Sequence, residues 1–117
     1  MPKALPVIDV SAPICCAPLA AAPMGEDVAV ELALRLKALA DPTRLRLLSI
    51  LLTASDGEVC GCDLASAVGL TEATISHHLS QLKKAGLAAS DKRGLNVFHR
   101  ANPQAIEALR GVLMTCC

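Results

Sequence analysis

Phe98 is the only aromatic residue in this sequence of 117 residues, although apolar residues make up 53% of it. The core must therefore be built from leucine, alanine, valine and isoleucine, and this composition favours packed helices over a β-sandwich. The length suits one small domain. No apolar run is long enough to span a bilayer, and the first residues lack the pattern of a signal peptide, so we expect a cytoplasmic protein without a membrane partner.

Apolar spacing and helix-boundary residues predict five helices and two strands. Asp41-Pro42, Thr71 and Asn102-Pro103 are residue types that begin helices, and Gly69 and Gly86 are typical of helix ends. The predicted helices cover residues 26–40, 42–53, 60–68, 71–86 and 103–114, and the predicted strands cover 87–90 and 95–100, with a turn at 91–94. A helix-turn-helix followed by a hairpin is a winged helix, so we expect a mainly α fold with a small β wing, in the order α-α-α-α-β-β-α.

Three segments follow from this pattern. Residues 1–25 are rich in proline, and we expect them to form a mobile arm that carries Cys15 and Cys16. Residues 26–114 are expected to form the winged-helix domain for DNA binding and dimerisation. Residues 115–117 are expected to form a short C-terminal tail.

The helix predicted at 71–86 has an outward face suited to DNA. Ile75, Leu79 and Leu82 are spaced to pack it onto the domain, which leaves hydroxyl, histidine and amide side chains outside. The net charge of the chain is zero, but residues 71–100 carry an excess of lysine and arginine over acidic residues. Any of these residues alone is typical of an ordinary surface, yet helix, turn and wing together favour operator DNA. The predicted DNA contacts are Thr71, Thr74, Ser76, His77, Gln81, Lys83, Lys84, Lys92 and Arg93.

The cysteines form three close pairs, which are Cys15-Cys16, Cys60-Gly61-Cys62 and Cys116-Cys117. In a cytosolic chain, such pairs indicate metal or redox chemistry. Cys60 lies near a predicted helix start, where the helix dipole favours the thiolate. Side chains two residues apart on an ideal helix point in different directions, so we expect one ion to reach both sulfurs only by opening the first helical turn. Such opening would disturb the DNA-binding helix that follows.

Three sequence runs resemble the arsenical-resistance repressor family, often called ArsR/SmtB. They are ALADPTRLRLLSIL (38–51), VCGCDL (59–64) and ATISHHLSQLKKAGL (73–87), and the resemblance extends over about residues 26–114. It implies a homodimer formed by the first and last helices, which binds a two-fold operator as a repressor. It also implies that the protein dissociates from DNA when an inducing ion binds.

The resemblance also implies which ions to consider. A CxC at Cys60 and Cys62 is similar to that of arsenic and antimony sensors, and together with Cys15 and Cys16 on an arm it is similar to cadmium and lead sensors. The predicted metal ligands are Cys15, Cys16, Cys60 and Cys62. We expect As(III), or Sb(III), because arsenite needs only three sulfurs, whereas Cd(II), Pb(II) or Zn(II) could use all four. The divalent-metal site that the family has on its last helix is not expected, because that helix offers Glu107 but no histidine or aspartate. We expect Cys116 and Cys117 to take no part, since a site at a chain end needs ordering.

Other functions remain to be weighed. An enzyme is not expected, because the sequence has neither a CxxC on a βαβ unit nor a nucleophilic cysteine in a phosphate-binding loop. A thiol metal buffer would leave the winged helix without a role. A redox sensor on the same scaffold, in which Cys60 and Cys62 are oxidised, stays open.

Overall fold

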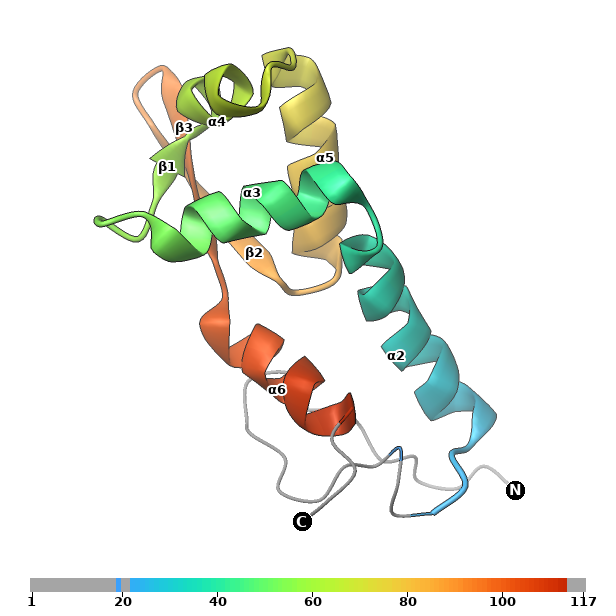
Figure 1. Cartoon of the computed structure of the whole chain (residues 1–117). Helices are drawn as coiled ribbons and strands as arrows, with labels where there is room; N and C mark the ends of the chain where they lie inside the picture. Colours follow the sequence, from blue (N-terminus) through green and yellow to red (C-terminus); the bar gives the residue numbers. More distant parts are fainter. Residues whose placement is uncertain (1–18, 20–21, 114–117) are drawn as a thin grey trace.

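The computed structural model describes residues 19 and 22–113. Within this part of the chain it has five helices and one three-stranded sheet, in the predicted order with one additional strand. The helices are α2 (Glu26–Leu39), α3 (Pro42–Thr53), α4 (Gly61–Val68), α5 (Glu72–Lys84) and α6 (Pro103–Leu113), and the strands are β1 (Val59–Cys60), β2 (Ala88–Arg93) and β3 (Asn96–Ala101) (Figure 1). The predicted winged helix-turn-helix is confirmed.

Side-chain caps fix where the helices begin. At the start of α3, Asp41 Oδ1 accepts hydrogen bonds from the backbone N–H groups of Thr43 (2.9 Å) and Arg44 (3.1 Å). The bond from the Arg44 N–H lowers the pKa of Asp41, since it stabilises the carboxylate. At the start of α5, Thr71 Oγ1 accepts from the N–H of Thr74 at 3.2 Å. Each cap satisfies amides that have no partner inside their helix.

The turn between α4 and α5 depends on Gly69. Its φ of 74° lies in the left-handed region, where a side chain would be strained. The Gly69 N–H donates to the carbonyl oxygen of Ala65 at 2.9 Å, which closes the end of α4. This sharp stop lets α5 leave at an angle to α4, as the helix-turn-helix requires.

The hairpin is longer than the sequence predicts, and the prediction of a turn at 91–94 was wrong. β2 continues to Arg93 and β3 begins at Asn96, so the turn consists of Gly94 and Leu95. Gly94 has a φ of 62°, a conformation that tight hairpin turns need. The polar run before Gly94 has the composition of a loop, but pairing across the hairpin draws it into the strand.

The strand β1 is absent from the sequence prediction. It pairs antiparallel with β3, with Val59 opposite His99 and Cys60 opposite Phe98, and the sheet order is β1-β3-β2. Two residues are too few to produce an alternating pattern, so the sequence gives no signal for this strand. Through it, the segment that precedes α4 is tied to the wing.

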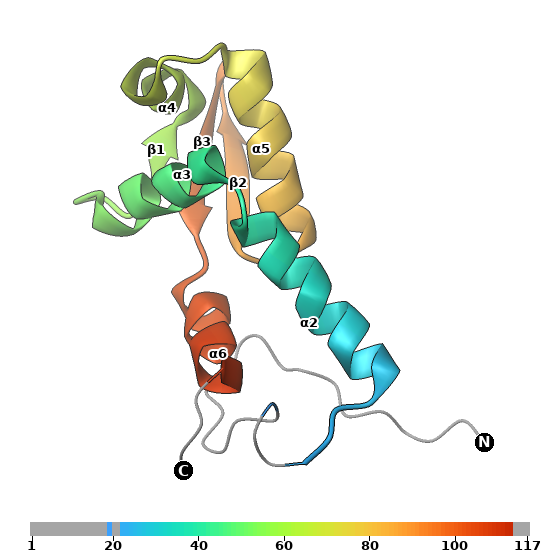
Figure 2. The same ribbon diagram turned by 45° about the vertical axis from the view of Figure 1, so that its right-hand side comes forward.

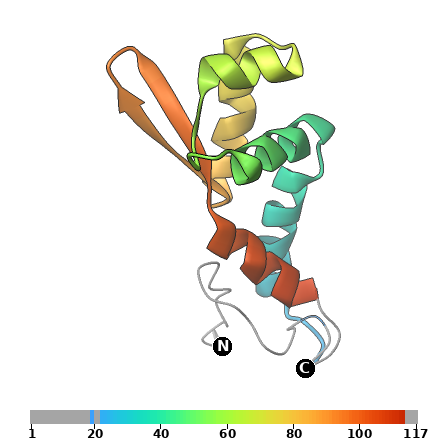
Figure 3. The ribbon, with the colours of Figure 1, turned by 60° about the vertical axis from the view of Figure 1, so that its left-hand side comes forward.

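The core lies between the helices and the sheet. Its largest fully buried side chains are Leu47, Leu51, Leu64, Ile75, Leu79, Leu82, Leu87 and Val112. The views in Figures 2 and 3 place α2 and α6 at the end of the molecule opposite α4 and the tip of the hairpin. The tip of the wing and the N-terminal part of α5 are therefore separate from the end at which α6 and the N-terminal part of α2 lie.

The apolar stripes on α2 and α6 pack largely within the chain. Val28 and Leu32 of α2 and Leu109 of α6 are buried within the chain, although the family resemblance implies that these two helices form the dimer contact. The exposed large apolar side chains of these two helices are Val30, Leu34 and Leu113. None of the described helices combines the length and the apolar character needed to cross a bilayer.

Candidate functional site

The helix α5 is fixed on one face and exposed on the other. Ile75, Leu79 and Leu82 are buried, as the sequence predicts, and they anchor the helix to the core. Thr71, Thr74, Ser76 and His77 are exposed, and so are Lys83 and Lys84, whereas Gln81 is half-buried. The predicted contacts on this helix are therefore accessible to a ligand. Whether they touch DNA stays a prediction.

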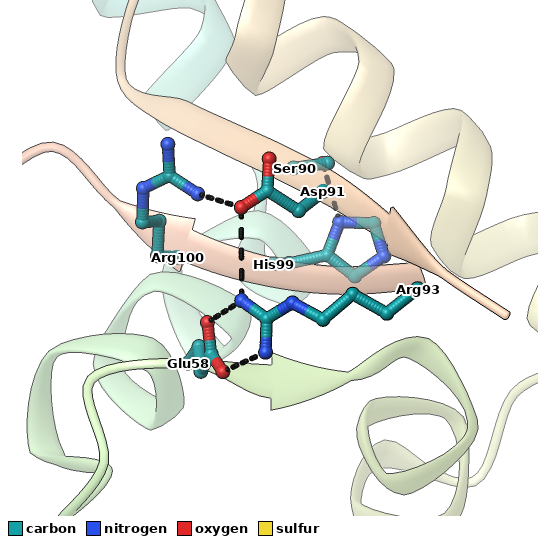
Figure 4. Close-up of polar contacts among 6 residues, drawn as sticks. All are labelled: Glu58, Ser90, Asp91, Arg93, His99 and Arg100. Atoms are coloured by element: carbon teal, nitrogen blue, oxygen red, sulfur yellow. Dashed lines mark hydrogen bonds and ion pairs between the residues drawn. The ribbon is translucent and has the colours of Figure 1, made fainter. Parts of the chain in front are cut away.

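The two predicted DNA contacts of the wing lie on β2. Lys92 and Arg93 are exposed on this strand. Arg93 is not a free charge, because its guanidinium donates to both carboxylate oxygens of Glu58 at 2.6 and 2.7 Å and lies 3.6 Å from Asp91 (Figure 4). It also stacks over Phe98, with Cζ 4.8 Å from the ring centroid. The hydrogen bond with Arg93 lowers the pKa of Glu58.

This pairing changes what the wing can offer to a phosphate. The charge of Arg93 is matched by Glu58, which lies just before β1. Lys92 has no ion pair with any residue in the described part of the chain. Lys92 is therefore the more available of the two predicted phosphate contacts on the wing.

The cysteine pair lies where β1 becomes α4. Cys60 is the N-cap of α4, its backbone is extended (φ −66°, ψ 145°), and its Sγ accepts a hydrogen bond from the N–H of Cys62 at 3.1 Å. The two cysteines are joined as a disulfide, with their Cα atoms 5.3 Å apart. The expectation that the sulfurs point apart was wrong, because Cys60 lies outside the helix and the ideal-helix rule does not apply to it.

A carboxylate completes this cluster. The ligand atoms of Cys60, Cys62 and Asp63 all lie within 4.8 Å of one another, with Cys60 buried and the other two exposed. Sequence reasoning missed Asp63, although an acidic residue in the first helical turn next to a CxC was a usable signal. With the disulfide reduced, the set offers two thiolates and one oxygen to a thiophilic ion. The other cysteines, Cys15, Cys16, Cys116 and Cys117, lie outside the described residues.

A groove of about 430 Å³ connects this cluster to the wing and to α5. It is lined by Cys60, Gly61, Cys62, Glu72, Ala73, Ile75, Ser76, Lys83, Leu95, Asn96, Val97 and His99. We call it the cysteine groove. Of the predicted DNA contacts, Ser76 and Lys83 line it, so these two side chains lie on the same groove as the sulfurs.

His99 forms part of the wall of this groove, although no sequence motif singles it out. It is 6% exposed, and its Nδ1 hydrogen bonds with Ser90 Oγ at 2.7 Å (Figure 4). Its Nε2 would lie 3.3 Å from a Cβ added at Gly61, so the ring occupies the space that a side chain there would need. Burial lowers the pKa of His99, and the charge of Lys83 adds to the effect. The neutral imidazole thus links the cysteine turn to both strands of the wing.

Comparison with known proteins defines the class first. Residues 41–90 match the family described as "Bacterial regulatory protein, arsR family". The chain is 35% identical over 77 residues to the arsenical resistance operon repressor of Staphylococcus xylosus, a match that covers 66% of this chain and 71% of that protein. It is 43% identical over 68 residues to an arsenic resistance transcriptional regulator of Pseudomonas putida, covering 58% and 52%, and 37% identical over 73 residues to a cadmium resistance regulatory protein homologue of Staphylococcus aureus, covering 62% and 59%.

Solved structures give the same class. The antimony-specific transcriptional repressor AntR is similar with a TM-score of 0.60 and 33% identity, over 74% of this chain and 77% of that one. A homodimeric winged helix-turn-helix domain from Mycobacterium bovis, described as a possible ArsR-family regulator, is similar with a TM-score of 0.62 and 26% identity, over 76% and 83%.

Fold and similarity therefore define a winged-helix regulator, and the relatives are named as transcriptional regulators and not as enzymes. The chain belongs to the ArsR family of bacterial regulatory proteins. The match spans only a little more than half the length of several curated relatives.

Proposed function

We propose that this protein is a homodimeric transcriptional repressor that binds operator DNA through α5 and the wing, and that As(III) or Sb(III) releases it by binding cysteine thiolates. The observation that carries the proposal is the position of Cys60 and Cys62. They lie together at the start of the first helix of the helix-turn-helix, on the same groove as Ser76 and Lys83 of α5. An event at the sulfurs is thus adjacent to the surface that contacts DNA.

Residues of this chain supply two routes from the sulfurs to the DNA. Cys60 pairs with Phe98 of β3, so a shift of Cys60 moves the wing strand. Cys62 lies in the first turn of α4, which leads through Gly69 into α5. In the structure the two sulfurs are bonded to each other as a disulfide. The expected opening of the first helical turn, when an ion binds the reduced pair, stays a prediction.

The choice of ion depends on the number of sulfurs. Arsenite takes three, and Cys60 and Cys62 supply two, so we assign the third to Cys15 or Cys16. If both of these took part, four sulfurs would suit Cd(II), Pb(II) or Zn(II). The relatives named for arsenic and arsenical resistance support As(III). The relative named for cadmium resistance is the reason to test a divalent ion as well.

We assign the dimer contact to α2 and α6. Val30 on α2 and Leu113 on α6 are exposed large apolar side chains, and these two helices lie away from the tip of the wing (Figure 3). The similar domain from Mycobacterium bovis is described as homodimeric. A dimer built at this end would leave both copies of α5 and the wing accessible to a two-fold operator.

The test is fluorescence anisotropy of a labelled DNA fragment from upstream of the gene, with reduced protein titrated in parallel with arsenite and cadmium. We expect tight binding that arsenite reverses, and loss of that response in Cys60→Ser and Cys62→Ser. The matched control is Cys116→Ser, which should respond like the wild type. Release by cadmium alone would indicate a four-sulfur site, and no binding to any upstream fragment would favour a thiol metal buffer.

A redox sensor is the second candidate, because Cys60 and Cys62 are joined as a disulfide. In such a sensor, peroxide would oxidise the two thiols to the disulfide, and the peroxide would be reduced to two molecules of water. Release of DNA by peroxide and not by arsenite or cadmium, reversed by a thiol reductant, would favour this function over the first.

A further inference from the structure

A second groove, of about 380 Å³, lies where α2, α3 and α5 meet. The C-terminal part of α2, the first turn of α3 and the C-terminal end of α5 are close together in both Figures 1 and 2. The lining residues are Leu34, Lys37, Ala38, Arg44, Gln81, Lys84 and Ala85. Each of the three helices contributes one cation, and none of these lining residues is acidic. We call it the basic groove.

The positive charge of this groove is largely uncompensated. Lys37 and Lys84 are exposed, and neither forms an ion pair with a residue that the structure describes. Arg44 forms only a long ion pair, in which its Nη2 lies 4.0 Å from Asp41 Oδ2. The Arg44 side chain is 17% exposed and its buried Nε has no hydrogen-bond partner among the described residues. Three cations held by three packed helices form a preorganised site for an anion.

We propose that the basic groove binds a backbone phosphate of the same DNA duplex that α5 contacts. The proposal rests on the DNA-binding function proposed above. Gln81 lies four residues after His77, and Lys84 three residues after Gln81, so they continue one exposed face of α5 into the groove. A phosphodiester is the anion that this continuity favours. Lys37 and Arg44, which lie outside the helix-turn-helix and the wing, thereby join the DNA-binding surface.

The experiment measures the salt dependence of DNA binding by Lys37→Gln. Loss of one phosphate contact lowers the steepness of log K for DNA binding against log salt concentration by about 0.9 per protomer. In a dimer, whose two protomers each have one basic groove, the change is therefore about 1.8. Arg46→Gln is the matched control. Arg46 is exposed on α3 only two residues from Arg44, but it does not line the groove. Thermal unfolding of both variants checks that they fold.

A duplex scanned with single neutral methylphosphonates identifies the contact directly. At one position per half-site, the substitution should weaken binding by the wild type more than binding by Lys37→Gln, which keeps only the cations Arg44 and Lys84 in the groove. Equal slopes for Lys37→Gln, Arg46→Gln and the wild type would overturn the inference, as would a Lys37→Gln variant that loses only its affinity for inorganic phosphate. Lys92→Gln on the wing separates the two proposals. If Lys92→Gln lowers the slope and Lys37→Gln does not, only the proposal for the basic groove is wrong. A wild-type protein that binds no DNA would overturn the proposed repressor function itself.

Discussion

Lys83 and Lys84 are neighbours in the sequence and were both predicted to contact DNA, yet they line different grooves. Lys83 lines the cysteine groove with Ser76 and His99, and Lys84 lines the basic groove with Lys37 and Arg44. The first groove has a buried polar wall, in which His99 is held by Ser90. The second has cations and no acidic lining residue. Consecutive residues on a helix point about 100° apart, so one helix can line two different grooves.

The largest expected effect is a loss of stability on truncation of Leu82, the buried side chain that anchors α5 between its two grooves. Leu82 is fully buried on α5 between Gln81 and Lys83, and Leu82→Ala should lower the free energy of unfolding by about 2–5 kcal/mol because it leaves a cavity. Urea unfolding measures this. Leu95→Ala, at the fully exposed hairpin tip, is the control and should change stability by no more than about 0.5 kcal/mol. Equal losses would mean that α5 is not held by its buried face.

A double-mutant cycle tests the wall of the cysteine groove. A Cβ at Gly61 would lie 3.3 Å from Nε2 of His99, which cannot easily move because Ser90 holds its other nitrogen. We expect Gly61→Ala to be less favourable in the wild type than in a His99→Ala background, with a coupling of about 0.5–3 kcal/mol in urea unfolding. The same effect of Gly61→Ala in both backgrounds would show that the ring does not support the turn.

The wing provides a test of charge compensation. Glu58 pairs with Arg93, so Glu58→Gln should release the guanidinium for a phosphate. We expect tighter DNA binding and a salt slope steeper by up to about 0.9 per protomer, measured by anisotropy. Asp56→Asn removes the same charge from the neighbouring loop and has no ion pair among the described residues to release. A similar change in both variants would point to net charge alone.

The smallest expected effect is a pH dependence of stability due to His99. Burial holds the pKa of His99 below its ordinary value of 6.5, so the unfolded chain takes up the proton first as the pH falls. The stability that comes from burying a neutral His99 is fully present above about pH 6.5, and it is lost as the pH falls through the folded-state pKa. His99→Gln should therefore flatten the loss of stability below pH 6.5, measured by urea unfolding. His77→Gln, on the exposed face of α5, is the control and should keep the wild-type dependence.

Much of the fold was predictable because its signals are local. Asp41 before Pro42, Thr71 before α5 and the spacing of Ile75, Leu79 and Leu82 each act within one or two helical turns. The sequence therefore located the five helices, the winged helix-turn-helix and the buried face of α5. It was less reliable for the hairpin, where cross-strand pairing moved the turn to Gly94 and Leu95.

By itself, the sequence determined which residues we propose as functional, namely the Cys60–Cys62 pair and the hydroxyl, histidine and lysine side chains of α5. Only the tertiary structure decided how they meet. The pairing of β1 with β3 makes Cys60 an extended N-cap beside His99, and packing of α2 and α3 on α5 separates Lys84 from Lys83. The physical reason is that helical periodicity is set by near neighbours, whereas these contacts join segments far apart in the chain, for which a single sequence carries no local signal.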